Sequence, residues 1–162
     1  LIIDVRRNNG GNIDSWIIEK LLRRAWAFWQ PRYGKRNDVN MQQSFRGQLA
    51  VLVDERTYSD GEAFATGIKK LNLGTVIGMR TAGAGVWLND NHTRLSDFGN
   101  ARTAQYPLHA MGSGELLVEH QGVEPDIVVE NPPHATFEGD DAQLETAIRV
   151  LLGKLETTRA AR

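Results

Sequence analysis

The chain has 162 residues, a net charge of −1 and no cysteine. The near-neutral charge gives no basic field for nucleic acid or an anionic membrane, and the lack of cysteine excludes disulfides, thiolate catalysis and cysteine-type zinc sites. No apolar run approaches the ~20 residues that a membrane span needs. A chain of this length is expected to form one domain that buries roughly 70% of its unfolded surface.

The first part of the chain alternates predicted strands and helices. Residues 1–6 read as a buried strand with no starting Met, no polar lead-in and no signal peptide, which indicates a fragment of a longer protein. An Asn- and Gly-rich loop follows at 8–12. Residues 13–29 have the apolar spacing of a helix, and the width of the apolar face predicts a second contact, with a domain or a subunit. The polar stretch 31–46 is expected to be a surface loop.

The rest of the chain predicts further strands and helices and a strand-rich segment. In chain order they are a strand at 48–54, a helix at 60–71, a strand at 75–79, a small-residue turn at 82–85, short strands at 103–108, 116–119 and 127–129, and a helix at 141–155. This order predicts an α/β domain with a mixed sheet and flanking helices. The domain is expected to cover residues 1–155, with a frayed tail at 156–162.

Ser59 lies between the predicted strand at 48–54 and the predicted helix at 60–71. With Glu62 three residues later it matches a capping box, which is a common way to begin a helix. The same position can present a nucleophilic hydroxyl near backbone N–H groups, with the Asp60 N–H as an oxyanion donor. From this segment alone both interpretations stay open.

Two other segments have candidate chemistry. The glycines of loop 8–12 allow a sharp turn that brings N–H groups close to a ligand, although an ordinary strand-to-helix turn has the same composition. The dinucleotide fingerprint Gly-x-Gly-x-x-Gly is absent. Glu119 precedes His120 and could form a catalytic dyad with it, but neighbours in an extended segment point to opposite faces, so the two cannot readily serve one site. We favour a surface histidine at His120 and a turn at 122–126.

Four motifs in one order resemble the catalytic core of the C-terminal-processing (tail-specific) serine peptidases, and in detail the tricorn-protease branch. They are the Gly-Gly loop at 8–12, Ser-Asp-Gly at 59–61, Val-Ile-Gly-x-Arg-Thr-x-Gly at 76–83, and Glu-x-x-Gly-Val-x-Pro-Asp at 119–126. Each motif is weak alone, whereas the four together are specific. The resemblance covers about residues 1–155.

The resemblance implies a crotonase/ClpP-like α/β core and a set of site residues. Ser59 would be the nucleophile, and Glu119 the carboxylate that orients the catalytic relay. N–H groups of Gly10 (or Gly11, one position further) and of Asp60 would form the oxyanion hole. No metal or organic cofactor is implied.

One departure concerns the general base. The tail-specific branch has a catalytic lysine between two glycines, and here Ala84 takes that position. The tricorn branch uses a histidine well upstream of the Gly-Gly loop, in a segment that this chain does not contain, so the isolated chain is expected to be inactive. The histidines present match no family motif: His92, His109, His120 and His134.

The resemblance also implies partners. They are peptide or oligopeptide substrates, upstream domains of the same protein that include a PDZ-like module, and further copies in a homo-oligomer. Two alternatives remain at this point. One is a peptide-binding or assembly domain that keeps the fold without the chemistry, and the other is a crotonase-type acyl-CoA enzyme, which would not need Ser59.

Overall fold

The computed structural model describes residues 1–34, 38–89 and 94–160, and its centre is a parallel sheet. The strands lie in the order β1 (Ile2–Asp4), β4 (Ala50–Val53), β5 (Thr75–Gly78) and β8 (Ile127–Val128). Every neighbouring pair in this sheet is parallel. The carboxyl ends of the strands therefore meet at one edge, where α/β proteins commonly place their sites.

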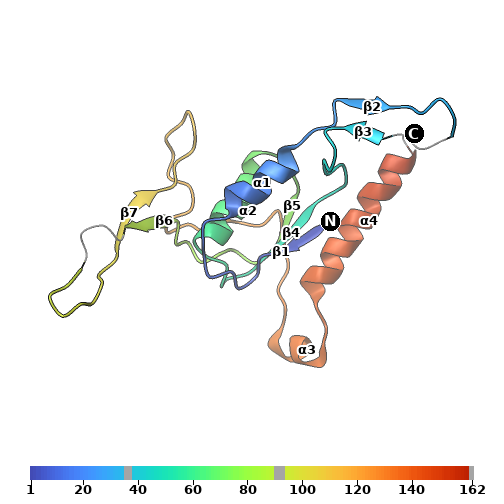
Figure 1. The fold of residues 1–162 in the computed structure, drawn as a ribbon. Helices are drawn as coiled ribbons and strands as arrows, with labels where there is room; N and C mark the ends of the chain where they lie inside the picture. Colours follow the sequence, from blue (N-terminus) through green and yellow to red (C-terminus); the bar gives the residue numbers. More distant parts are fainter. Residues whose placement is uncertain (35–37, 90–93, 161–162) are drawn as a thin grey trace.

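Helices cover both faces of this sheet (Figure 1). Side chains alternate between the two faces along a strand, so Val51 and Val53 of β4 pack with the cluster that contains α1 (Asp14–Leu22) and α2 (Asp60–Lys70). Ala50 and Leu52 pack instead against α4 (Ala142–Ala160). The α/β class that the sequence predicted is confirmed as a three-layer arrangement with the sheet in the middle.

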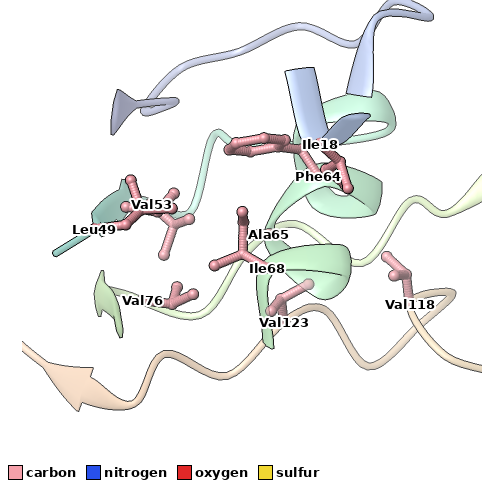
Figure 2. Close-up of a cluster of buried hydrophobic side chains, with 10 residues drawn as sticks. Ile18, Leu49, Val53, Phe64, Ala65, Ile68, Val76, Val118 and Val123 are labelled. Carbon is pink, nitrogen blue, oxygen red and sulfur yellow. The ribbon is translucent and has the colours of Figure 1, made fainter. Parts of the chain in front are cut away.

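The core between the sheet and α1 and α2 fixes the two helices relative to each other. Figure 2 shows Phe64, Ala65 and Ile68 of α2 lying against Val53 and Val76 of the sheet. At Gly67 the two helices are in close contact, because a Cβ atom there would lie 2.5 Å from Ile18 Cδ1 of α1. The N-termini of α1 and α2 also lie side by side, because the Ile13 N–H donates to Asp60 Oδ2 at 2.9 Å.

The predicted helix at 13–29 is wrong beyond Leu22, where α1 ends. Residues Ala27–Trp29 form β2, which pairs antiparallel with β3 (Asp38–Asn40). The strand β3 lies inside the segment 31–46 that was expected to be a loop. Phenylalanine and tryptophan favour strands, and this preference prevails once the helical face has nothing to pack against. Trp26, Phe28 and Trp29 are exposed, so the second contact expected for this face is not made within the described residues.

Other boundaries also differ from prediction. The expected strand at 116–119 has only an isolated bridge between His109 and Leu116. Antiparallel pairing lies outside the central sheet, in the β2–β3 hairpin and in β6 (Val86–Asn89) with β7 (Thr103–Pro107). A short helix, α3 (Pro133–Glu138), begins with proline in its first turn.

The final helix is longer than predicted. α4 continues past Leu155 to Ala160, so most of the segment expected to be frayed is helical. Within the described ranges, neither α4 nor another helix is long and apolar enough to cross a membrane.

Arg6 joins the end of β1 to the start of α4. Its guanidinium donates to both oxygens of Asp4, to both oxygens of Asp141, at 2.9 and 2.8 Å, and to Gln143 Oε1 at 3.1 Å. Asp141 in turn accepts the Leu144 N–H at 2.9 Å and so caps α4. The strand that leads into the glycine loop is therefore anchored to the last helix.

The hydrogen bonds of Asp141 predict that the folded chain becomes less stable at acidic pH. Hydrogen bonds from Arg6, with smaller contributions from Asn131 and the Leu144 N–H, hold the pKa of Asp141 well below its usual range. A lowered pKa means that the ionised carboxylate stabilises the fold at pH values above the unfolded pKa of about 3.9, and that this contribution is lost as the pH falls through the folded value.

We expect the free energy of unfolding, measured with urea, to fall between about pH 5 and pH 2. The Asp141→Asn variant should be less stable than the natural chain at pH 7 and should lose less stability on acidification. Equal losses in the two chains would contradict this assignment.

Candidate active site

Ser59 occupies a strained turn between β4 and α2. Its backbone angles are φ 56° and ψ −118°, whereas a serine that merely caps a helix has φ and ψ in the β region. A non-glycine residue held at such angles costs about 1–3 kcal/mol, and residues of this kind cluster at functional sites. A strained strand-to-helix turn is also how α/β-hydrolases expose a nucleophilic serine.

Glu62 holds this turn in place. It forms the predicted capping box with Ser59, whose N–H donates to Glu62 Oε2 at 3.0 Å. The same carboxylate accepts three more hydrogen bonds, from Thr81 Oγ1 at 2.5 Å, Gly83 N at 2.7 Å and Ala84 N at 2.9 Å. Because Glu62 is fully buried, it acts as a rigid link between the serine turn and the loop after β5.

The glycine loop lies directly against the serine. A Cβ atom on Gly10 would lie 2.9 Å from Ser59 Cβ, 3.1 Å from Ser59 Oγ and 3.9 Å from the Asp60 nitrogen. The φ of Gly10 is +93°, which also favours glycine. The structure therefore brings Gly10 against the consecutive residues Ser59 and Asp60, although Gly10 is distant from both in the sequence.

The backbone N–H groups beside Ser59 differ in whether they already have a hydrogen-bond partner. Gly10 N–H donates to Asn8 Oδ1 at 2.8 Å. In the described part of the chain, the N–H groups of Gly11 and Asp60 have no hydrogen-bond partner. The Asp60 N–H stands at the N-terminus of α2, where the helix dipole favours negative charge.

Glu119 is held at the far side of the loop that Glu62 contacts. Its Oε2 accepts the Gly85 N–H at 2.8 Å, and the His120 N–H donates to Gly83 O at 2.8 Å. His120 is exposed and has φ +67°, as expected of a surface histidine in a turn. Hydrogen bonds thus run from the Ser59 turn through Glu62 and residues 83–85 to Glu119.

The described lysine and histidine candidates for a general base have other partners or are exposed. Lys69 donates to Glu124 O at 2.5 Å and pairs with Asp126 at 2.9 Å. His109 and His134 are exposed, whereas His92 lies outside the described residues. Among the residues that the structure describes, no group of three or more His, Asp or Glu side chains is placed to hold a metal ion.

Comparisons with known proteins place this chain in a family. The family model of peptidase family S41 matches residues 1–129. The tricorn protease of Thermoplasma volcanium is 38% identical over 156 residues, which cover 96% of this chain and 15% of that protein. Tricorn protease homolog 1 of Streptomyces coelicolor is 36% identical over 160 residues, with 99% and 15% covered. The chain thus spans 15% of the length of these relatives.

Solved structures agree with these matches. A crystal structure of the tricorn protease superposes with a TM-score of 0.85 at 35% identity, over 96% of this chain and 15% of that one. The photosystem II D1 C-terminal processing protease has a TM-score of 0.53 at 24% identity, over 93% and 38%, and supports the fold alone. The chain belongs to peptidase family S41, as the order of its motifs predicted.

Proposed function

We propose that this chain is the catalytic core of a tricorn-like serine peptidase that hydrolyses peptide bonds through an acyl-enzyme on Ser59. The observation that carries the proposal is the strained backbone of Ser59, at φ 56°, with its side chain against Gly10 at the start of α2. An ordinary helix cap needs neither the strain nor the contact with the glycine loop.

In the proposed reaction, Ser59 Oγ attacks the peptide carbonyl and gives its proton to a general base. The carbonyl oxygen becomes an oxyanion that accepts the Asp60 N–H and one N–H from the glycine pair. The bond from Gly10 N–H to Asn8 favours Gly11 as that second donor. One such donor is typically worth about 3–4 kcal/mol in the transition state. The C–N bond then breaks, the amine leaves with a proton, and water hydrolyses the ester to restore the hydroxyl.

The general base is proposed to be a histidine from a segment upstream of this chain, oriented by Glu119. Two observations support this division. Ala84 takes the position of the lysine of the tail-specific branch, and Lys69 on the helix after Ser59 is already paired with Asp126. A serine without a base is a very weak nucleophile, so the isolated chain is proposed to be inactive.

Labelling tests the proposal. The full-length protein, with its upstream segment, is treated with a serine-directed phosphonate, and the modified residue is located by mass spectrometry. We expect stoichiometric modification of Ser59 and none in the Ser59→Ala variant, whereas a Ser15→Ala control, altered at an exposed serine on α1, is labelled normally. An unmodified Ser59 would refute the nucleophile assignment, and peptide hydrolysis by the isolated chain would refute the missing base.

A second candidate, a peptide-binding or assembly domain without catalysis, is favoured by a single observation, the alanine at position 84. The same experiment separates the two functions. Peptide binding by a full-length protein whose Ser59 stays unlabelled would support the non-catalytic domain.

A further inference from the structure

Helix α1 begins without a cap of its own. The residue at its N-cap position is Ile13, which makes no capping hydrogen bond with its side chain. The Ile13 N–H donates instead to Asp60 Oδ2 at 2.9 Å, across 47 residues of sequence. Asp60 lies in the first turn of α2 and is 4% exposed. One helix is therefore capped by a carboxyl group that belongs to the other.

The carboxyl group and the backbone nitrogen of Asp60 both lie against the glycine loop. Its carboxyl group lies beside Gly11, where a Cβ atom would be 3.5 Å from Oδ2. Its backbone nitrogen lies beside Gly10, where a Cβ atom would be 3.9 Å away. The glycine pair is thus placed between the main chain and the side chain of one residue, next to the Ser59 turn.

We propose that the Asp60 side chain is a positioning residue, which fixes the glycine loop to the serine turn and so sets the separation of the two oxyanion donors. Asp60 then contributes twice, with its backbone N–H as one donor and with its carboxyl group as the anchor of the loop that supplies the other. The catalytic part rests on the proposed function. The anchoring itself rests on the contacts alone.

The hydrogen bond from the Ile13 N–H needs an acceptor oxygen at position 60, whether or not that oxygen is charged. Burial raises the pKa of Asp60, the bond from Ile13 N–H lowers it, and the nearby carboxylate of Asp14 raises it again. The ionised form is therefore disfavoured by its surroundings. Asparagine keeps a carbonyl oxygen for the Ile13 N–H and removes the charge, whereas alanine removes both.

Hydrogen–deuterium exchange in the full-length protein tests the anchor. In the Asp60→Ala variant, exchange of the Gly10 and Ile13 amides should quicken by at least about tenfold, because the loop opens without its hydrogen bond to Asp60. Asp60→Asn should restore protection. Asp126→Ala is the matched control, since Asp126 Oδ2 also accepts a distant backbone N–H, that of Val76 at 2.8 Å, but lies away from the loop. Unchanged exchange at Gly10 and Ile13 in Asp60→Ala would overturn the anchor.

The rate of phosphonate labelling at Ser59 tests the catalytic consequence. Misplacing an oxyanion donor by about 1 Å can cost on the order of 10²-fold, so Asp60→Ala should lose roughly that much and Asp60→Asn should recover at least tenfold of it. Faster loop exchange with an unchanged labelling rate would overturn the positioning role. Faster loop exchange in a protein whose natural Ser59 is never labelled would support the anchor and refute the proposed function.

Discussion

The Ser59→Ala variant of the full-length protein is expected to lose about 10⁶-fold in kcat for peptide hydrolysis. Alanine removes the proposed nucleophilic atom but leaves the proposed oxyanion donors in place, so the residual rate should stay about 10³–10⁴-fold above that in water. The free energy of unfolding should fall by no more than about 0.5–2 kcal/mol, the cost of losing a serine cap, because serine and alanine pay a similar cost at φ 56°. The measurement is hydrolysis of an oligopeptide substrate, with circular dichroism and thermal unfolding to verify the fold.

The control for this variant is Ser15→Ala, which changes an exposed serine on the neighbouring helix and should hydrolyse the peptide at the natural rate. A Ser59→Ala protein that keeps more than about 1% of the natural rate would contradict nucleophilic catalysis by Ser59. That result would indicate another nucleophile, or direct attack by water on the peptide carbonyl.

Among the substitutions expected to destabilise the fold, replacement of Glu62 with alanine should lower the free energy of unfolding the most. Its carboxylate accepts four hydrogen bonds at a fully buried position, and the variant leaves the four donors without partners. A buried donor without a partner costs about 1–3 kcal/mol, and relaxation of the loops recovers part of the sum. We expect the free energy of unfolding in urea to fall by about 3–5 kcal/mol.

A matched control for this prediction is Glu124→Ala, because the Glu124 side chain is largely exposed and its partner Arg80 is 3.7 Å away. Its free energy of unfolding should change by less than about 0.5 kcal/mol. A loss below about 1 kcal/mol in Glu62→Ala would show that the loops adjust freely and that Glu62 is not the link between them.

The central sheet and the Ser59 turn could be predicted because their signals are local. Each core strand is a short apolar run bounded by turn residues, and the order of the motifs fixed the family. The prediction of a helix around Trp26 and Phe28 is wrong because the apolar spacing there continues that of α1, whereas the pairing of β2 with β3 leaves no mark in that spacing. Both side chains are exposed, so burial did not decide the outcome.

The details of the site depend on contacts between distant segments, which one sequence does not reveal. The pairing of Glu62 with Ser59 can be predicted from their spacing of three residues. The bonds of Glu62 to Thr81 and Gly83 cannot, because these two residues lie on another loop. The choice between Gly10 and Gly11 depends on the orientation of the Asn8 side chain. The anchoring role of Asp60 depends on two helices starting side by side.

The ion pair between Arg6 and Asp141 joins residues that are 135 positions apart. During synthesis a chain emerges from its N-terminus, so β1 and the glycine loop exist long before the carboxylate that holds them. Contacts of such long range form slowly because a large loop must close first. The β1 strand that leads into the glycine loop is therefore expected to gain its anchor to α4 late, so the proposed site would reach its full stability only after α4 has been made.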